Sequence, residues 1–331
     1  MRIVCLGAHI LDVLGRPVVD IPPGQGRRVL DEIRVTAAGT AGGTAVDLAK
    51  LGAEVTGIGP IGDDVSGRLL RELLGEHGVD TSGLAVRAGQ ATPSTILPVR
   101  PNGERPALHA PGAMGRLTLA DVDLDLVAAA DVLHVGGPDV LGDFTVDGLP
   151  TVLRHARAHA TTVSMDLLSV GRDGLFDELA TLWPLVDHFL PNDDQLRSLI
   201  GTDDLVDAAG TVRRAGTGTV IVTCGADGAL VCSGDGTTRV PAHEVAVIDT
   251  TGCGDAFTAG FLVGRLRGES LLDAARLGTA AAAQVAQGLG SDAGIRDLPS
   301  TLALRDAHGT ASGTADGRVR PSGTASGAEV G

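Results

Sequence analysis

The feature of this chain that most constrains its fold is a regular alternation along about residues 1 to 300. Short runs rich in β-branched residues alternate with longer segments rich in alanine and leucine, in which apolar residues recur at i, i+3 and i+4. This order is typical of an α/β domain, in which helices flank a mostly parallel sheet. The predicted core strands are residues 3–6, 55–58, 132–135, 162–165, 188–190, 220–223 and 229–232. The predicted helices are residues 45–51, 66–77, 145–158, 205–215, 255–266 and 271–287.

Two regions interrupt this alternation, at about residues 16–36 and 84–110. Both contain strand-like pieces without helices between them, and residues 101–103 (Pro-Asn-Gly) are a turn signal. We therefore predict a small β lid inserted into a single α/β domain of residues 1–305. Residues 306–331 are rich in Gly, Ala, Ser and Thr and show no periodic apolar face, which predicts a disordered tail.

The charge and composition of the chain exclude several classes of function. The balance of 26 basic against 41 acidic residues gives a net charge of −15, which opposes binding to nucleic acids and anionic membranes. No run of 18 apolar residues occurs, residues 1–15 lack a signal-peptide leader, and the four cysteines lack metal-ligand spacing. A cytoplasmic protein with reduced thiols is expected. Lys50 is the only lysine, so a P-loop is excluded, and a nucleotide would need helix N-termini, arginines or a metal ion.

The segment with the clearest chemical meaning is a glycine-interrupted turn near residue 250. A short apolar run ends in Asp249, glycines follow at 252 and 254, and a predicted helix begins near Asp255. Glycines there allow consecutive backbone N–H groups to point outward at the start of the helix, which makes a site for an anion. A carboxylate at the edge of that site can take a proton from an alcohol while the site holds a phosphoryl group. Taken alone, the pattern also fits a helix cap at Asp255 after an ordinary turn.

Residues 249–255 read D-T-T-G-C-G-D, which resembles the C-terminal signature D-T-x-G-A-G-D of the ribokinase/PfkB carbohydrate-kinase family. The resemblance implies a ribokinase-like fold, with a Rossmann-like, mostly parallel sheet and a β lid. It also implies a kinase that uses ATP and Mg²⁺ to phosphorylate a hydroxyl of a small sugar or sugar derivative. Asp255 would be the general base, and Gly252, Cys253 and Gly254 would form the anion hole. Cys253 stands where alanine is usual, and its place near a helix N-terminus predicts a reactive thiol.

Further segments extend the resemblance over about residues 3 to 300, in the family's order. They are residues 38–52, 57–64, 190–195 and 222–229. The resemblance implies that Asp12, Gly39, Thr40 and Gly43 bind the acceptor. The predicted lid adds three candidate contacts to the acceptor: Arg100, Arg105 and His109. The resemblance also implies that ATP is bound by six residues: Asn192, Thr223, Gly225, Gly228, Gly254 and Thr279. A monovalent cation such as K⁺ would be bound by Asp249 and the Thr251 carbonyl. Taken singly, Asp12 also fits a turn carboxylate, Asn192 a helix N-cap and Thr223 an ordinary strand residue.

Several positions differ from ribokinase itself and leave the acceptor open. Thr40 stands where ribokinase has a lysine, Ile10 where it has an asparagine and Gly137 where it has a glutamate. Gly43 stands where most members of the family have an asparagine. A ribose site in this chain would therefore lack many of the partners of the sugar hydroxyls. Sugars, sugar acids and nucleosides all remain as acceptors, and a non-catalytic metabolite sensor is a third hypothesis.

Two further differences concern the metal and the oligomeric state. Gln195 replaces the glutamate of the family's N-x-x-E segment, so either Asp193 or Asp194 compensates or the magnesium dependence differs. Many relatives form homodimers through lid strands. In this chain four apolar lid residues serve either that contact or the packing of the lid itself: Val18, Val19, Ile96 and Leu97.

Overall fold

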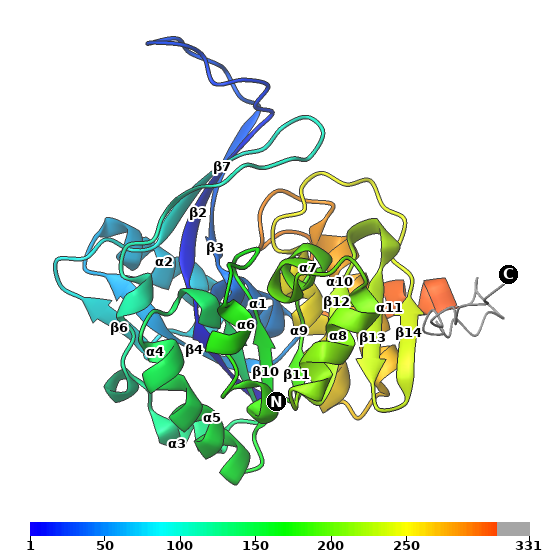
Figure 1. Cartoon of the computed structure of the whole chain (residues 1–331). Coiled ribbons are helices and arrows are strands. Elements are labelled where there is room, and N and C mark those ends of the chain that lie inside the picture. Colours follow the sequence, from blue (N-terminus) through cyan, green and yellow to red (C-terminus); the bar gives the residue numbers. More distant parts are fainter. Residues whose placement is uncertain (310–331) are drawn as a thin grey trace, which may run out of the picture.

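A ten-stranded sheet runs through the part of the chain that the computed structural model describes, residues 1–309 (Figure 1). All neighbouring strands pair in parallel except at one edge, where a single strand pairs antiparallel with both of its neighbours, so the predicted mostly parallel α/β class is confirmed. The order is β14 (Gly236–Val240), β13 (Ala229–Ser233), β12 (Thr219–Thr223), β11 (His188–Phe189), β10 (Thr162–Asp166), β9 (Val132–Gly136), β1 (Arg2–Gly7), β4 (Glu54–Gly62) and β5 (Val79–Asp80), and β6 (Leu84–Arg87) also pairs with β4.

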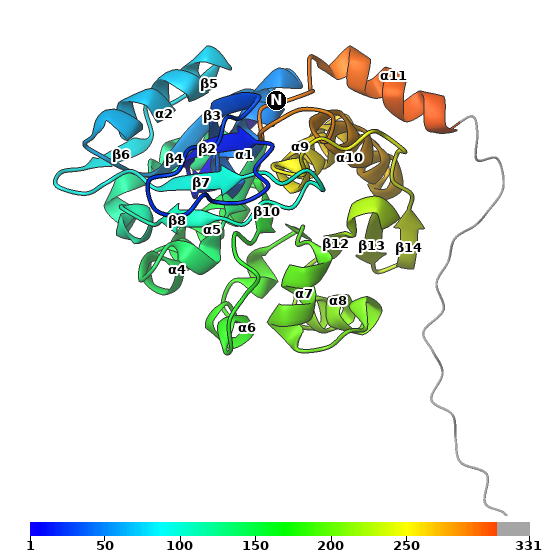
Figure 2. The same ribbon diagram turned by 90° about the horizontal axis from the view of Figure 1, so that it is seen from above.

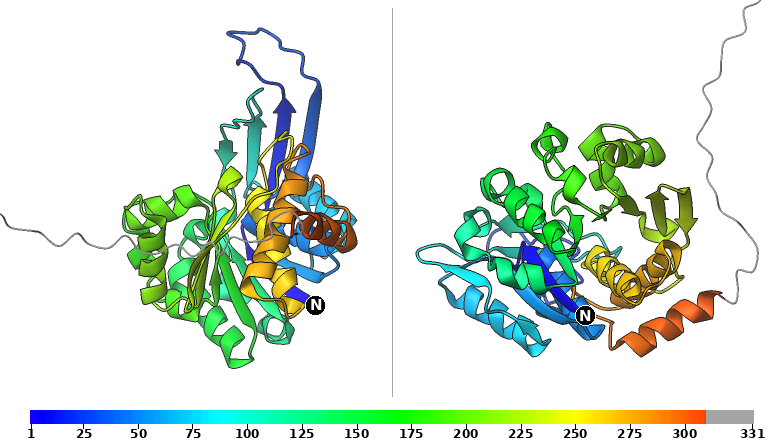
Figure 3. Two further views of the ribbon diagram at one scale, coloured as in Figure 1. Left: turned by 90° about the vertical axis from the view of Figure 1, so that its right-hand side faces the viewer. Right: turned by 90° about the horizontal axis from the view of Figure 1, so that it is seen from below.

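Helices cover both faces of this sheet and close two apolar cores (Figure 3). One layer contains α1 (Thr40–Lys50), α2 (Val65–Glu76), α9 (Cys253–Leu266), α10 (Leu271–Val285) and α11 (Leu298–Gly309). The other contains α3 (Leu124–Ala129), α4 (Phe144–Asp147), α5 (Leu149–Ala158), α6 (Leu175–Glu178), α7 (Asp193–Ile200) and α8 (Leu205–Arg214). Strand β1 serves both cores because its side chains alternate: Cys5 lies in the first core, and Val4 and Leu6 lie in the second.

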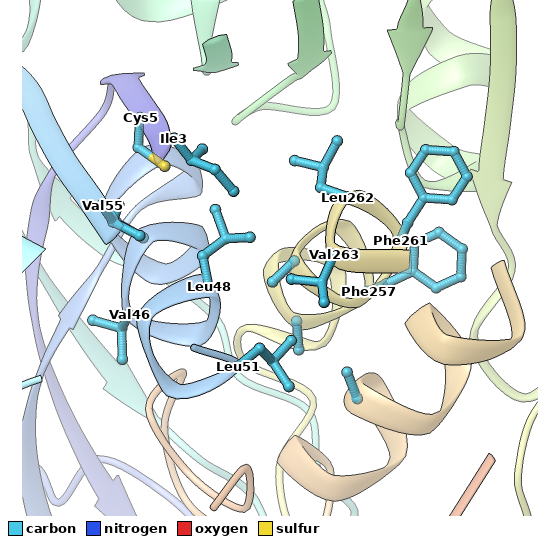
Figure 4. Close-up of a cluster of buried hydrophobic side chains, with 14 of the residues drawn as sticks. Ile3, Cys5, Val46, Leu48, Leu51, Val55, Phe257, Phe261, Leu262 and Val263 are labelled. Atoms are coloured by element: carbon cyan, nitrogen blue, oxygen red, sulfur yellow. The ribbon is translucent and has the colours of Figure 1, made fainter. Parts of the chain in front are cut away.

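Helices α1 and α9 pack side by side in the first core (Figure 4). Leu48 of α1 and Leu51, which follows that helix, face Leu262 and Val263 of α9, and each of the four is at most 1% exposed. Burying one such side chain stabilises the fold by about 1.5–3 kcal/mol. This packing holds the N-terminal turns of the two helices, which carry predicted site residues, at fixed positions relative to each other.

A second, four-stranded sheet rises from the body at the ends of the central strands (Figures 1 and 3). Its order is β3 (Glu32–Ala38), β2 (Ile10–Arg16), β7 (Ser94–Pro98) and β8 (Leu108–Ala110). We call it the small sheet. Strand β3 packs against α1 and α2 (Figure 2). Leu97 is buried with Leu14, Val99 and Leu289, so this predicted lid residue belongs to internal packing.

The small sheet differs from the predicted lid in its boundaries. It begins at Ile10, earlier than the predicted start near residue 16, because β2 follows β1 after only two residues. Residues 84–87, predicted as part of the lid, form β6 and pair with residues 59–62 of β4 in the central sheet. The alternation of apolar residues predicted strands here but could not assign them to one sheet or the other.

Three helical predictions also differ from the structure. The single helix predicted at residues 145–158 is divided into α4 and α5 at Gly148, where a side chain would meet the Phe144 ring at 2.4 Å and where Pro150 begins a new helix. Helices α3, α6, α7 and α11 were not predicted. Helix α11 continues to Gly309, past residue 306 where the tail was predicted to begin, and residues 310–331 lie outside the described part of the chain.

Candidate active site

The glycine turn before α9 has the geometry expected of an anion site. Gly252 adopts a left-handed conformation (φ 78°), and a side chain there would lie 2.5 Å from the Cα of Ser291. Helix α9 begins at the next residue. Gly254 has no atom within 4 Å of the position that a Cβ would take, so open space lies in front of the first helical turn. Backbone N–H groups at a helix start, facing open space, suit a phosphoryl group.

Asp255 lies at this turn, partly accessible and pressed against α1. A Cβ at Gly43 would lie 2.6 Å from Oδ2 of Asp255, so the carboxylate occupies the space that a side chain at position 43 would need. Burial, followed by the charge of Asp12, raises the pKa of Asp255 to about 7, while Arg105 and the Thr44 hydroxyl act in the opposite direction. A carboxylate with such a pKa can accept a proton near neutral pH.

Asp12 approaches the same place from the small sheet. It lies within β2, which excludes the turn alternative, and it is only 6% exposed. Burial raises the pKa of Asp12 to about 6, although a hydrogen bond from Thr95 and the charge of Arg105 lower it. Gly39 (φ 83°) precedes α1, and its missing side chain leaves room for the carbonyl of Ala8, 2.5 Å from the position of a Cβ.

Arg105 reaches the glycine turn from the loop between β7 and β8. Its Nε lies 3.6 Å from Oδ1 of Asp249, and Nη2 donates to the carbonyl of Thr250 at 3.3 Å. Asp249 is fully buried and accepts hydrogen bonds from the backbone N–H and hydroxyl of Thr251 and from the Gly290 N–H. The guanidinium is therefore positioned beside the anion site and already paired with a carboxylate.

Thr40 and Gly137 lie beside each other between the ends of β1, β9 and β10. A Cβ at Gly137 would lie 3.2 Å from Oγ1 of Thr40, and the Thr40 carbonyl accepts from Nε2 of His134 at 3.3 Å. The Gly137 N–H donates to the backbone carbonyl of Asp166, the last residue of β10. Burial and the nearby Asp255 raise the pKa of Asp166 well above its usual range. The acceptor candidates and Asp255 therefore surround one region at the carboxyl ends of the strands, where α/β proteins bind ligands.

The predicted nucleotide residues form a neighbouring strip at the same edge of the sheet. Asn192 and Thr223 pair as an isolated parallel bridge between the ends of β11 and β12. Gly225 and Gly228 then form a tight turn with positive φ angles of 53° and 82°. At Gly228 a side chain would collide with the carbonyl of Val240, 2.0 Å from the position of its Cβ. The turn therefore requires glycine at position 228 because it packs directly against the backbone at the end of β14.

The side chain of Gln195 is buried, and both of its polar atoms are hydrogen-bonded within the protein. Its backbone N–H donates to Oδ1 of Asn192, and its own Oε1 accepts from the Asn192 N–H, which makes a capping box at the start of α7. Its Nε2 donates to the carbonyl of Leu167 at 2.8 Å. The alternative of Asn192 as an N-cap is thus confirmed, and the amide of Gln195 does what a glutamate could not, because it donates as well as accepts.

Three other predicted residues bond to neighbours in their own helices. Asp193 and Asp194 both lie near Arg197, at 2.6 and 3.6 Å, and the Asp194 side chain is 77% exposed, so neither replaces a charge inside the site. Thr279 is buried in α10, and its hydroxyl donates to the carbonyl of Arg276 in the same helix. Within the described residues, no hydrogen bond joins Thr279 to the turns after β11 and β12.

The prediction of a reactive thiol at Cys253 is wrong. Burial raises the pKa of Cys253 to about 12, and the charge of Asp249 adds to this although Arg105 opposes it. The sulfur lies 3.7 Å from the carbonyl of Ala282. The position at a helix N-terminus does not compensate for removal from water, so the thiol stays protonated at neutral pH.

Some polar residues near the site were missed by the sequence analysis. Asp47 of α1 is fully buried, both of its carboxyl oxygens lack a partner among the described residues, and burial raises its pKa well above the usual range. A charged residue inside the apolar run 45–51 was the available signal. Asp166 and Thr95 carried no such signal, because only the strand register brings them to the site.

The chain is similar to known proteins in family, sequence and structure. The model of the pfkB family of carbohydrate kinases matches residues 2–298. A fructokinase from Klebsiella pneumoniae is 30% identical over 260 residues, which cover 76% of this chain and 83% of the relative.

Two solved structures extend the similarity to the fold. A ribokinase from Arabidopsis thaliana, complexed with ribose and ATP, has a TM-score of 0.77 at 22% identity and covers 92% of this chain and 98% of its own. An adenosine kinase from Sinorhizobium meliloti has a TM-score of 0.77 at 25% identity, over 94% of this chain and 99% of its own. The predicted ribokinase-like fold is confirmed. No helix in the described residues is both long and apolar enough to cross a bilayer.

Proposed function

Because the chain belongs to the pfkB family of carbohydrate kinases, ATP-dependent phosphotransferases with an alcohol acceptor, we propose that it phosphorylates a small sugar or sugar derivative with Asp255 as general base. One observation carries the assignment of the base. Asp255 is a partly accessible carboxyl group beside the glycine turn, with a pKa raised by burial to about 7. A carboxyl group used only as a helix cap would gain nothing from such an environment, whereas a general base works best when its pKa is near the working pH.

In the proposed reaction, the acceptor lies between Asp12 and Asp255. Its hydroxyl oxygen attacks the γ-phosphorus of ATP and forms the new P–O bond, while the bond from that phosphorus to the β–γ bridging oxygen breaks and ADP leaves. Asp255 takes the hydroxyl proton. The backbone N–H groups of Gly252, Cys253 and Gly254, together with Arg105, stabilise the charge on the transferring group.

ATP would lie along the strip formed by Asn192, Thr223, Gly225 and Gly228, with its phosphates directed to the glycine turn. When bound, Mg²⁺ would neutralise charge on the phosphates of ATP. Within the described residues no group of three metal-ligating side chains occurs. K⁺ at Asp249 and the Thr251 carbonyl remains a proposal, and rates in equal concentrations of KCl and NaCl measure it.

A nucleoside is the second acceptor class, favoured by the similarity to an adenosine kinase. The third hypothesis, a non-catalytic sensor, depended on Gly43 and Gln195. Gly43 is explained by the space that Asp255 occupies, and Gln195 by the capping box, so neither residue argues for lost activity.

The proposed function is tested by ADP release coupled to a spectrophotometric assay, over pentoses, hexoses, sugar acids and nucleosides. We expect acceptor-dependent ADP release with at least one sugar. Turnover of a nucleoside alone would favour the second class, and the absence of acceptor-dependent release from all of them would contradict the kinase assignment.

We further propose a homodimer formed by the outer face of the small sheet. Ile33 and Val35 of β3, Ile96 of β7 and Leu108 of β8 are 38–67% exposed there, an apolar row that a second copy could cover. Light scattering after size exclusion should give twice the chain mass. Ile96→Lys should yield monomers with an unchanged far-ultraviolet spectrum, and a monomeric parent protein would exclude the dimer.

A further inference from the structure

The inner face of the small sheet carries a row of four polar residues across its four strands. Asp12 of β2 is in register with Thr36 of β3 on one side and with Thr95 of β7 on the other, and Thr95 is in register with His109 of β8. Residues in register on neighbouring strands project from the same face of a sheet. The adjacent register positions carry the exposed apolar row, so the two faces have opposite character.

The hydrogen bonds of this row run in one direction. Oγ1 of Thr95 lies 3.0 Å from Nδ1 of His109, and the Thr95 side chain lies close enough to the Asp12 carboxyl group to lower its pKa. A hydroxyl has a single proton, and an ionised carboxylate can only accept, so when Thr95 donates to Asp12 it must accept from Nδ1–H of His109. Partial burial of the ring lowers the pKa of His109, which favours neutral imidazole. Nε2 of that ring is then an acceptor on the exposed end of the row.

Other polar groups at the site lack partners of their own. Among the described residues, the hydroxyl oxygens of Thr36 and Thr40 are buried without a hydrogen-bond partner. Buried polar groups are nearly always paired in folded proteins, so such hydroxyls mark places where a ligand or water completes the bonding. They fit a ligand that brings several hydroxyl groups.

The charges around the row disfavour an anionic ligand. The charge of Asp249 raises the pKa of Asp12, and the charge of Asp12 raises the pKa of Asp255, so three ionisable carboxyl groups lie close together here. Arg105 is the cation that acts on all of them, and it is already paired with Asp249 and the carbonyl of Thr250. A phosphate or carboxylate on the acceptor would meet like charges in a partly buried region.

We propose that the row Thr36–Asp12–Thr95–His109 selects an uncharged polyhydroxylated acceptor, with Asp12 and Nε2 of His109 each accepting a hydrogen bond from a separate hydroxyl. This inference rests on the proposed kinase function and narrows its substrate class to neutral sugars or ribosides, against sugar phosphates and sugar acids. Thr95 acts through Asp12 and is a positioning residue, because its bond fixes the orientation of the carboxylate.

The substrate class is tested by kcat/KM for ADP release with D-fructose, D-ribose and adenosine, compared with fructose 1-phosphate, fructose 6-phosphate and 2-keto-3-deoxygluconate. We expect one of the neutral compounds to exceed every charged one by roughly tenfold or more. If a charged compound is best, the inference is wrong while the kinase function stands. If no compound supports ADP release, the kinase function itself fails.

The row is tested separately by paired variants assayed with the best neutral acceptor. Thr95→Val keeps the shape but removes the hydroxyl, and should raise the acceptor KM roughly 10- to 100-fold while kcat and the KM of ATP change less than about threefold. Thr95→Ser should restore the parent KM. His109→Leu should raise the same KM and His109→Gln should largely preserve it, since an amide both donates and accepts.

The outcomes separate recognition from a merely structural role. An acceptor KM within about twofold of the parent in Thr95→Val and in His109→Leu would overturn the row. Equal losses in kcat and in both KM values, together with a lower thermal midpoint, would assign Thr95 to folding alone and would also overturn it. If Thr95→Val does not fold, the two His109 variants give the same decision from an exposed position.

Discussion

Around Asp12 and Asp255 several buried polar groups lack partners within the described protein, whereas the turns after β11 and β12 bond their polar groups to one another. On the acceptor side, hydroxyls of Thr36 and Thr40 are unpartnered, and burial raises the pKa values of both carboxyl groups. On the nucleotide side, Gln195 completes a reciprocal capping box. The two halves of the site therefore differ in whether their buried polar groups already have hydrogen-bond partners in the protein or depend on a ligand for them.

This difference follows from what each half must recognise. A buried, unpaired polar group costs about 1–3 kcal/mol, so it persists where a ligand can provide the missing bond. A nucleotide can be held by backbone groups of rigid turns, which require no unpaired side chains. Changes on the acceptor side should accordingly alter chemistry without lowering stability, and changes on the nucleotide side should lower stability with little effect on chemistry.

The largest effect is expected from Asp255→Asn, which removes the proposed base and keeps the size of the side chain. General-base catalysis contributes typically 10²–10⁴-fold, so kcat should fall by about that factor while the Kd of ATP changes little. Single-turnover assays and calorimetric titration with ATP measure the two quantities. Turnover within a few-fold of the parent would reject Asp255 as the base.

Gly43→Ala should have the next largest effect. The new Cβ would lie 2.6 Å from Oδ2 of Asp255 and must displace the carboxylate. A displacement of about 1 Å can lower the rate about 10²-fold. Gly42→Ala is a matched control in the same helix, since its Cβ would lie 3.5 Å from His9, an ordinary contact. Equal losses in both variants would show that α1, and not the position of Asp255, is responsible.

The pH dependence of the rate should reflect the raised pKa of Asp255, about 7. The base must be ionised, so kcat/KM should fall about tenfold per pH unit below that value, and more steeply below about 6 as Asp12 also gains a proton. The residual activity of Asp255→Asn should lack the transition near pH 7. A parent profile that stays flat between pH 5 and 8 would contradict the assignment.

The same pKa shift has the opposite consequence for stability. The pKa of Asp255 is raised in the folded protein above its unfolded value, so the ionised form is disfavoured by folding. Its contribution to stability is complete below about pH 4 and is lost as the pH rises to about 7. The thermal midpoint of Asp255→Asn should therefore exceed that of the parent at pH 8, and the difference should shrink toward pH 4. A pH-independent difference would show that the carboxyl group is not perturbed.

The sequence predicted the glycine turn and its carboxylate well, because these features are local. Gly252 needs its left-handed backbone, and Asp255 follows at the start of a helix, so the order of residues alone places them together. The row of Thr36, Thr95 and His109 could not be predicted in the same way. It depends on the register of four strands, whose row residues lie up to 97 positions apart in the chain (Asp12 to His109), and no local signal fixes that register.

The smallest catalytic effect, and the sharpest test of the nucleotide side, is expected from Gln195→Glu. A carboxylate keeps the bond from the Asn192 N–H but cannot donate to the carbonyl of Leu167, which Nε2 of Gln195 now bonds at 2.8 Å. Leaving that carbonyl unpaired beside a negative charge should lower the free energy of unfolding by about 1–3 kcal/mol, while kcat and the KM of ATP stay within a few-fold. Denaturant titration measures the first quantity and the coupled assay the others, with Asp194→Asn as an exposed control. An unchanged stability together with tighter ATP binding would mean that position 195 acts on the nucleotide or its metal, and the contrast between the two halves of the site would no longer hold.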